Sequence, residues 1–531
     1  MAPEAAPRTA PSGPPGEALH SLGEAMAALS VATDFAMAQS AHFGMRSCAL
    51  AVRLADAMGW SEQDTRQAYF QALLRYVGCN VESEVIATVV GDEMAMRRDF
   101  AGIDTADRQA VASLVVRRLR EAHAGMPAWR LAGKIVSTLL TAEKTMAGIF
   151  AGHCEVGRRL ATRIGFDDAT VQSLGQLYER WDGRGLPLHL RGEAVSPAAL
   201  LVTLAQDVVV HHDAGGADAA VAVVRQRRGG AYAPAMADAF LRQARALLAD
   251  LDSATASRMV AVPGGDEPLD DARFDAICEA MADFVDIKSP WTLSHSSGVA
   301  TLSQRAAKQL GLPDAEATLL RRAALLHDVG KVGVSAAVWC KPSALSLPER
   351  EQVRLHAYYT ERILSSSPAF AALAEVASLT HDRLDGSGYF RWPPAAGLSV
   401  AARILAAADH YHALIEARPH RAALARDAAA RALTGEAQAG RLDARACEAV
   451  LEAAGHPAPA KARGTSLTER EIEVLRTLAR GRSMKEIARE LGIAPKTVDH
   501  HLQRIYAKIG VTTRAGATLY AMEQGFTAAL H

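Results

Sequence analysis

The chain has 531 residues, several times the length of a single domain of about 100 to 200 residues, so we expect several packed units. Hydrophobic residues make up 49% of it and charged residues 22%, proportions that exclude wholesale disorder and fibrous repeats. The formal net charge of -1 argues against a chain that coats nucleic acid or an anionic membrane along its whole length. The segment from Lys461 onward nevertheless carries 12 basic and 7 acidic side chains, so we expect any nucleic-acid contact there.

Residues 1–18 are rich in Ala and Pro and predict a disordered tail, because they lack the basic start and apolar core of a signal peptide. The 6 cysteines form no C-x-x-C pair, which indicates reduced thiols in the cytosol rather than a disulfide framework or a thiolate zinc site. No run approaches the roughly 20 apolar residues that a spanning helix requires. We therefore expect a cytoplasmic protein with no membrane partner.

Apolar residues recur at helical rather than alternating spacing in stretches such as 315–326 and 371–379. This pattern predicts an all-α protein. Two segments that are rich in Pro, Gly or Ala, residues 262–270 and 456–465, interrupt the helical pattern and predict linkers. The linkers divide the chain into three expected domains, at residues 19–261, 271–455 and 466–531.

The first two domains share an internal repeat. Leu73–Gly78 can be aligned with Leu325–Gly330, and Trp181–Pro187 with Leu384–Phe390. Three further pairs keep a separation of 202 or 203 residues: His153 with His356, Asp182 with Asp385, and Asp207 with Asp409. The first pair is 252 residues apart, so about 50 extra residues must be absorbed between positions 80 and 140 or their counterparts. We interpret the two domains as an ancient duplication; the alternative is that Ala-rich helices resemble each other by composition alone.

The second copy concentrates imidazole and carboxylate groups, the ligand types that bind first-row metals. His327 and Asp328 follow an apolar helical stretch, and we expect Gly330 to terminate that helix. Both side chains would then lie at a helix end, where ligands from other helices can join them. A carboxylate there can bridge two metals about 3.5 to 4 Å apart, which polarise a phosphoryl oxygen and activate water for in-line attack on a phosphodiester.

This order of residues resembles the HD superfamily of metal phosphohydrolases. The stretch HDRLDGSGYF at 381–390 is similar to its HD-GYP branch, whose members hydrolyse the bacterial second messenger cyclic di-GMP. The resemblance covers about residues 286–455 and implies a divalent metal centre with six ligands: His295, His327, Asp328, His356, His381 and Asp409.

The same resemblance implies a role at the scissile phosphate for Lys331, beside Asp328, and contacts with the substrate phosphates for Arg418 and Arg421. Mn, Fe and Mg all suit such a centre. Trp291 stands where some members place an extra acidic ligand, so we expect at most two metal ions.

Three positions depart from the family pattern. The usual paired histidines appear as Thr380 and His381, the terminal Pro of the motif appears as Phe390, and His412 replaces a common Asp. Threonine is a poor ligand beside imidazole, so one metal position is expected to be weak. The departures keep two alternatives open: a catalytically inactive ligand sensor, and a phosphohydrolase for another nucleotide or phosphate ester.

The first copy cannot build the same centre. Arg75 and Tyr76 replace the His-Asp pair, Cys79 replaces the lysine, and Leu177 and Tyr178 replace the paired histidines. We expect a degenerate HD-like domain without catalysis, whose remaining His and Asp residues are buried and hydrogen-bonded. Its pocket could hold a small ligand without turning it over, or the domain could serve only as a packing partner for the second copy.

The basic C-terminal end predicts a helix-turn-helix. Thr468 and Ser483 each start a capping box with a Glu three residues later, and Gly481 and Gly492 supply left-handed stops. Pro495 suits the first position of a third helix that runs to Gly510. The short turn before that helix is typical of helix-turn-helix geometry.

The pattern of Lys485–Ala488, Pro495–Val498 and Lys508–Val511 resembles the LuxR-type four-helix DNA-binding domain. The resemblance implies binding to double-stranded DNA as a homodimer, and the outward side chains are expected to contact the DNA: Lys496, Thr497, Asp499, His500, Gln503, Arg504 and Lys508. Together these features predict a cytoplasmic bacterial transcription regulator in which a metal-dependent phosphodiesterase domain, binding and cleaving a cyclic dinucleotide, controls DNA binding.

Overall fold

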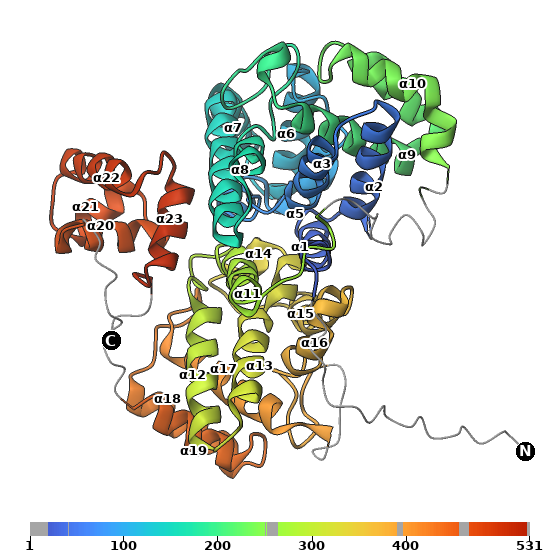
Figure 1. Ribbon diagram of the computed structural model, residues 1–531. Coiled ribbons are helices and arrows are strands. Elements are labelled where there is room, and N and C mark those ends of the chain that lie inside the picture. The colour runs from blue at the N-terminus through green and yellow to red at the C-terminus, as the bar shows by residue number, and fades with distance from the viewer. Residues whose placement is uncertain are drawn as a thin grey trace, which may run out of the picture.

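The computed structural model describes residues 20–40, 42–249, 251, 264–389, 397–455 and 467–527. Over these residues the secondary structure is helical, with isolated β-bridges and no strand, which confirms the predicted all-α class. Figure 1 shows two helical bundles, one above the other, and a smaller red module beside them. The expected tail at 1–18, the linker at 456–465 and the first two residues of the linker at 262–270 lie outside the described residues. The remainder of that second linker, residues 264–270, is described and contains no helix.

The first bundle contains two long helices, each over 30 residues, surrounded by shorter ones. The shorter of them, α9, is broken in the middle at Gly215–Gly216, where the backbone is not helical. The helices of this bundle are α1 (Leu22–Ala36), α2 (Phe43–Ala57), α3 (Glu62–Leu74), α4 (Ser83–Val90), α5 (Glu93–Phe100), α6 (Arg108–Ala122), α7 (Ala128–Ile164), α8 (Asp168–Leu174), α9 (Pro197–Arg227) and α10 (Pro234–Leu248).

The second bundle repeats this plan with shorter helices and contains the predicted metal ligands. Its helices are α11 (Asp271–Asp286), α12 (His295–Gln309), α13 (Asp314–Leu326), α14 (Ala336–Trp339), α15 (Leu347–Leu364), α16 (Ala371–Ala377), α17 (Val400–Ile415), α18 (Arg426–Gln438) and α19 (Ala444–Ala453). Short 3-10 turns join some of them, including η2 at Val329–Gly333.

The C-terminal module consists of α20 (Glu469–Ala479), α21 (Met484–Glu490), α22 (Pro495–Ile509) and α23 (Arg514–Glu523). Both predicted capping boxes are present, at Thr468 and Ser483, so the hydroxyl and the carboxylate satisfy free backbone N–H groups at each helix start. Gly481 and Gly492 have positive φ and end the first two helices, as predicted.

The two bundles share one detail of backbone packing, which agrees with the proposed duplication. Gly78 lies so close to His153 that an added Cβ would stand 2.0 Å from the carbonyl oxygen of that residue. Its counterpart Gly330 stands in the same relation to His356, at 1.9 Å. Both bundles therefore use a glycine to let a loop cross directly over a histidine-bearing helix.

This contact corrects the expected role of Gly330. The helix that precedes His327 ends at Leu326, and Gly330 lies four residues later inside η2, without the positive φ of a left-handed helix stop. Its lack of a side chain serves the crossing over α15 instead. Sequence spacing alone does not distinguish these two uses of glycine.

The extra residues of the first copy form α4, α5, α6 and the first part of α7, between Gly78 and His153. The corresponding stretch of the second bundle, from Gly330 to His356, contains only η2, α14 and the start of α15. The insertion thus lies in the first copy, where it adds a layer of helices over one end of the bundle.

Buried polar contacts join the two bundles. The carboxylate of Glu93 on α5 is fully buried and accepts hydrogen bonds from Ser335 Oγ at 2.6 Å and from the Ala336 backbone N–H at 2.8 Å, at the start of α14. Lys288 Nζ lies 3.4 Å from the same carboxylate. At the end of α7, Arg163 pairs with Asp283 on α11. A buried carboxylate that serves as a helix cap across the boundary holds the two bundles in one orientation.

Candidate metal centre and nucleic-acid interface

Five helices or helix ends bring the predicted ligands together. His295 is the first residue of α12, and the buried Asp286 of α11 holds this helix start by accepting hydrogen bonds from the backbone N–H and hydroxyl of Ser296, at 2.9 and 2.8 Å. The remaining ligands come from the end of α13 and from later elements: His327, Asp328, His356 in α15, His381 after α16, and Asp409 in α17.

The first half of the cluster is formed by His295, His327 and Asp409, whose ligating atoms all lie within 4.8 Å of one another. His295 Nε2 lies 3.2 Å from Asp409 Oδ1, and His327 Nε2 lies 3.6 Å from the same oxygen. Two imidazole nitrogens and a carboxylate oxygen that converge in this way form a ligand set for a first-row divalent ion.

The second half is formed by Asp328, His356 and His381, again within 4.8 Å. Asp328 belongs to both halves, because its Oδ1 lies 3.5 Å from His356 Nε2 while its Oδ2 lies 3.3 Å from His327 Nε2. The structure thus places Asp328 between the two groups of histidines, the position of a bridging ligand.

Several of these buried atoms have no hydrogen-bond partner among the described residues: His327 Nε2, His356 Nε2, His381 Nε2 and Asp328 Oδ1. Native proteins rarely leave buried polar atoms unsatisfied, and a group of them aimed at one point indicates a missing ion or ligand. The types of these side chains and their unpartnered nitrogen and oxygen atoms fit a divalent metal centre.

The electrostatics of the cluster divide its histidines into two kinds. Burial alone would lower the pKa of His327, but the Asp328 and Asp409 carboxylates raise it to about 10. Burial lowers the pKa of His356 to about 4 and holds that of His381 well below its usual range. A neutral imidazole presents a lone pair, which is the form that ligates a metal.

The other ring nitrogens are held in place by the protein. His327 Nδ1 lies 2.7 Å from the Ala324 carbonyl, and His356 Nδ1 contacts the Val353 carbonyl. Such contacts set the tautomer and aim Nε2 at the cluster.

One residue of this outer layer was missed from the sequence. Glu416 Oε2 lies 2.8 Å from His295 Nδ1, and its other oxygen lies 3.1 Å from His412 Nδ1. Glu416 follows Asp409 by seven residues, two helical turns, so helical spacing was the available signal. The departure at His412 is accommodated by Gly298, where an added Cβ would lie 2.0 Å from His412 Nε2.

The three predicted phosphate-binding side chains are placed differently. Lys331 Nζ pairs with Asp328 and lies over the Trp339 ring, 5.2 Å from its centroid, so it borders the cluster. Arg418 donates to Glu416 Oε2 at 2.7 Å, and Glu416 in turn contacts the predicted ligand His295. The guanidinium of Arg421 donates to backbone carbonyls at the end of α17, which gives it a helix-capping position.

On the C-terminal module, most of the predicted DNA contacts lie along the exposed side of α22. Lys496, Thr497, His500, Gln503 and Arg504 are all exposed. Asp499 is half-buried and accepts a hydrogen bond from Gln503 at 3.2 Å, and Lys508 pairs with Glu471 at 2.7 Å. The exposed side chains of α22 are therefore accessible to DNA. The charge of Lys508 is paired with Glu471 inside the module.

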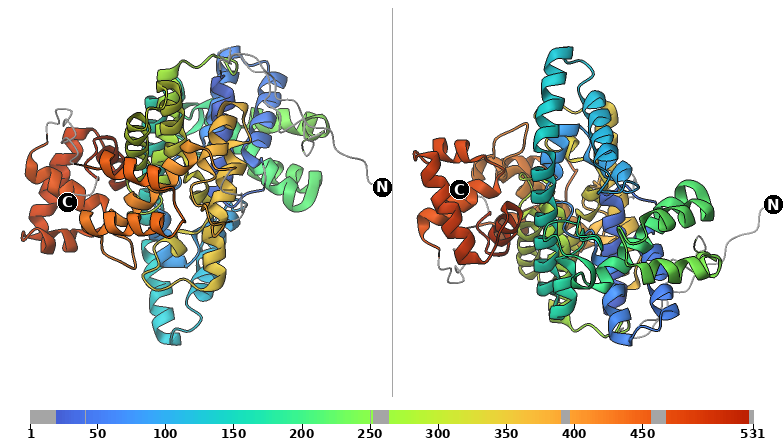
Figure 2. Two further views of the ribbon diagram at one scale, coloured as in Figure 1. Left: turned by 90° about the horizontal axis from the view of Figure 1, so that it is seen from below. Right: turned by 90° about the horizontal axis from the view of Figure 1, so that it is seen from above.

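The opposite side of this module packs against α7, as the right view of Figure 2 shows. Glu155 of α7 accepts hydrogen bonds from Thr513 Oγ1 at 2.6 Å and from the Thr512 backbone N–H at 3.1 Å, just before α23. Arg159, one turn along, donates to the Ile509 carbonyl at 3.0 Å. The first bundle therefore covers α23 and the end of α22, and leaves the face of α22 that carries Lys496, His500 and Arg504 exposed.

Comparison with known proteins agrees with both parts of the chain. The profile of the HD domain family matches residues 279–446, and that of the bacterial regulatory proteins of the luxR family matches residues 465–521. A 3'3'-cGAMP-specific phosphodiesterase of Vibrio cholerae, phosphodiesterase 3, is 31% identical over 417 residues, which span 77% of this chain and 89% of the relative. The chain belongs to the HD-GYP family.

Two further comparisons show which parts of this HD-GYP protein resemble other proteins. The crystal structure of a cyclic GMP-AMP-specific phosphodiesterase of Vibrio cholerae aligns with a TM-score of 0.58 at 27% identity, covering 83% of this chain and 99% of the other. The probable transcriptional regulatory protein NarL of Mycobacterium tuberculosis is 52% identical over 58 residues, 11% of this chain and 27% of its own. The chain joins an HD-GYP domain to a LuxR-type DNA-binding domain. Among its described helices, none has the length and apolarity to cross a membrane.

One departure of this HD-GYP domain, Thr380, directly precedes the predicted ligand His381. Thr380 is buried, and its hydroxyl donates to the Ala377 carbonyl at 2.8 Å, so the side chain is engaged with its own backbone. Tyr389 stacks on His381 with ring centroids 4.6 Å apart. Phe390 lies outside the described residues.

Restoring the second histidine of the HD-GYP pair tests whether position 380 faces the metals. We expect Thr380→His to raise metal affinity about tenfold, because it adds an imidazole beside His381. Thr380→Val, which removes only the hydroxyl, is the matched control and should leave metal affinity unchanged. Metal titration followed by elemental analysis measures both; equal affinity in the two variants would show that position 380 points away from the centre.

Proposed function

We propose that the HD-GYP domain hydrolyses a cyclic dinucleotide at a centre of at most two divalent metal ions, with Mn, Fe and Mg as candidates. The proposal is supported by the convergence of His295, His327 and Asp409 on one side of Asp328, and of His356 and His381 on the other. One observation carries it: four buried ligating atoms at this point have no partner among the described residues. The Vibrio cholerae relative supplies one candidate substrate, 3'3'-cGAMP, and the HD-GYP resemblance supplies the other, cyclic di-GMP.

The residues present fit such a centre, with Asp328 as the shared ligand. When bound, the ions would act as Lewis acids on the scissile phosphate and lower the pKa of water. Lys331 borders the cluster and offsets negative charge that develops on the phosphate. Glu416 fixes the ring of His295, and the Arg418 guanidinium, which pairs with Glu416, is placed to attract the second phosphate.

The direct test is the metal content of the full chain purified anaerobically, followed on the same sample by turnover assays with added Mn, Fe or Mg. We expect bound metal and conversion of 3'3'-cGAMP or cyclic di-GMP to linear or fully cleaved product. Bound metal with turnover of neither dinucleotide would contradict the proposed substrate class. Absence of metal after reconstitution would contradict the centre itself.

A second function has a specific observation in its favour. This function is a ligand sensor, which binds the dinucleotide without cleaving it. Thr380 occupies the place of a metal ligand, and its hydroxyl donates to the Ala377 carbonyl, so one metal position lacks an imidazole. Binding by calorimetry without product formation, in protein that contains metal, separates this sensor from the enzyme.

We also propose that the C-terminal module binds double-stranded DNA as part of a homodimer in the bacterial cytoplasm, and that the HD-GYP domain controls this binding. The exposed face of α22 and the covered face of α23 support the proposal. Glu155 and Arg159 of the first bundle contact the module directly, so a change in the larger domains could reach it through α7.

Removing Lys496 tests the DNA contact. We expect Lys496→Ala to weaken binding about equally on all DNA sequences and to lower the slope of log affinity against log salt by about 1, since an exposed lysine at a helix start suits a phosphate. Lys308→Ala, which removes the same charge from α12, should change neither quantity. Fluorescence anisotropy over a salt series measures the effect, and a loss confined to one sequence would make Lys496 a base contact.

A further inference from the structure

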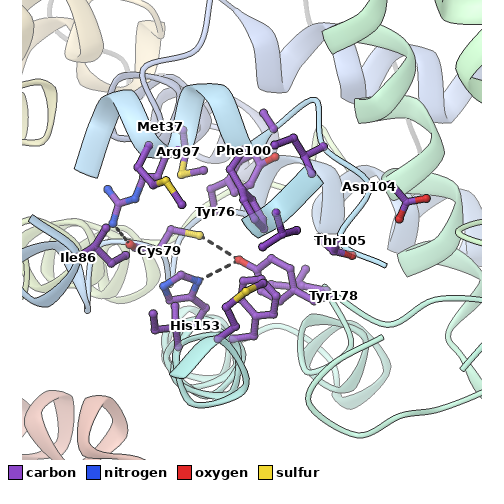
Figure 3. Close-up of a pocket in the computed structure, with 18 of the residues that line it drawn as sticks. Met37, Tyr76, Cys79, Ile86, Arg97, Phe100, Asp104, Thr105, His153 and Tyr178 are labelled. Atoms are coloured by element: carbon purple, nitrogen blue, oxygen red, sulfur yellow. Dashed lines mark hydrogen bonds between the residues drawn. The ribbon is translucent and has the colours of Figure 1, made fainter. Parts of the chain in front are cut away.

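The first bundle contains a chamber that no catalytic role explains. Its volume is about 340 Å³, at the lower end of the range for ligand pockets. Figure 3 shows its position, with His153 and Tyr178 on one side and Phe100 and Tyr76 above them. The chamber lies where the second bundle has its metal centre, because His153 is the counterpart of His356.

The inserted helices build most of the chamber wall. Side chains from α4 to α7 line it and are mainly aliphatic or aromatic, for example Val89, Phe100, Val115, Ile149 and Phe150. The second bundle has no such helices between Gly330 and His356. The insertion has therefore added an apolar compartment to the remnant of a metal site.

The inner end of the chamber is polar and holds three donors without acceptors. Arg75 Nε, His153 Nε2 and Gln206 Nε2 have no hydrogen-bond partner among the described residues, and each of the three side chains is at most 7% exposed. His153 Nδ1 lies 3.0 Å from the Tyr178 hydroxyl. When that hydroxyl donates to Nδ1, Nε2 carries the ring proton and becomes a donor. Three buried donors that face one space lack an acceptor, which an anion would supply.

The chamber also contains a buried positive charge, which favours an anion as well. Arg75 donates to Thr203 Oγ1 at 3.0 Å, and no carboxylate of the described residues pairs with it. The other lining arginines are engaged: Arg180 with Asp104 and Asp182, and Arg227 with Asp207. Arg97 donates to Ser83 Oγ and two backbone carbonyls. Arg75 is thus the buried cation that stands ready for a partner from outside the chain.

Burial and the nearby Arg97 lower the pKa of His153 to about 3, so its imidazole is neutral and adds no second positive charge. The Arg75 guanidinium donates to Thr203 and lies over the Tyr178 ring, 6.0 Å from its centroid, but among the described residues it has no carboxylate partner. Such a cation beside neutral donors matches a planar monoanion with two oxygens, which an arginine can hold with two parallel hydrogen bonds. The apolar walls match a hydrocarbon chain attached to that anion.

We propose that this chamber is a binding site for an amphipathic monocarboxylate, with its carboxylate on Arg75, His153 and Gln206 and its apolar chain among the inserted helices. A cyclic dinucleotide carries two phosphates and two polar bases, which these aliphatic walls would leave without partners. The site is independent of the metal centre and uses none of the residues that form it.

Calorimetric titration of the full chain with decanoate tests the site, and 1-decanol serves as the neutral probe of equal chain length. We expect one saturable site for decanoate and binding of decanol weaker by 10-fold or more. Arg75→Met removes the charge while keeping an unbranched side chain, and should weaken decanoate binding about 10- to 100-fold with little effect on decanol. Arg75→Lys should restore part of the decanoate affinity, as the charge returns without the planar fork.

A second variant keeps the test valid if Arg75→Met fails to fold. Ala142 lines the chamber from α7, and Ala142→Trp should fill the space and abolish decanoate binding while metal content stays unchanged. Three results would overturn the proposal: no binding of any carboxylate from octanoate to dodecanoate, equal binding of decanoate and decanol, or loss of cyclic dinucleotide binding on changing Arg75.

Discussion

Replacing Asp328 with Asn is expected to lower phosphodiester hydrolysis at least about 1000-fold, equivalent to about 4 kcal/mol of transition-state stabilisation. The variant keeps the shape of the side chain but removes the charge shared by the two groups of histidines. Asp328 lies 3.3 Å from His327 and 3.5 Å from His356, so its loss affects both halves of the cluster at once. Metal content and turnover of both candidate dinucleotides measure the effect.

The matched control is Asp314→Asn, which removes a carboxylate from the exposed first turn of the same helix, α13. It should leave hydrolysis unchanged. DNA binding by the C-terminal module should survive in both variants, because Asp328 makes no contact with that module. Hydrolysis that persists in the Asp328 variant would mean that the cluster is not the reaction centre.

Replacing Gly330 with Ala is expected to destabilise the HD-GYP domain by about 3 kcal/mol or more. The new Cβ would stand 1.9 Å from the His356 carbonyl oxygen and 2.4 Å from the Thr360 backbone nitrogen, both of them atoms of a packed helix. The crossing loop must move away from α15. Because that loop follows directly after Asp328, the metal centre should loosen together with the fold. Thermal denaturation and metal affinity report the two effects.

Gly435→Ala provides the control, since Gly435 lies inside α18 and an added Cβ would meet nothing within 4 Å. Alanine is the better helix former, so this variant should be neutral or more stable by up to about 1 kcal/mol. A Gly330→Ala protein as stable as the Gly435→Ala protein would show that the two segments separate without cost.

Local patterns allowed much of this structure to be predicted. The capping boxes at Thr468 and Ser483 depend on residues three apart, and both form as expected. The all-α class followed from helical spacing of apolar residues, and the duplication from residues that keep their separation. The predicted metal ligands meet because each occupies a fixed place in a repeated helical plan.

Features that depend on contacts between distant segments could not be predicted in this way. The use of Gly330 at a helix crossing requires knowledge of where α15 lies. The covering of α23 by Glu155 joins residues more than 350 positions apart, and no local pattern marks either partner. The chamber could not be predicted without the path of the inserted helices, although the sequence already showed Arg75 in the place of a metal ligand.

The unbroken helix α7 connects the chamber, the C-terminal module and the second bundle. Its 37 residues extend over about 55 Å. Thr138 in the chamber wall and Arg163, which pairs with the second bundle, lie on opposite sides of Glu155, on arms of about 25 and 12 Å. If the helix pivots as a rigid body where it holds the DNA-binding module, any displacement of the chamber wall is halved at Arg163 and the force is doubled. In that case a displacement of the chamber wall would reach the second bundle through a short, stiff arm.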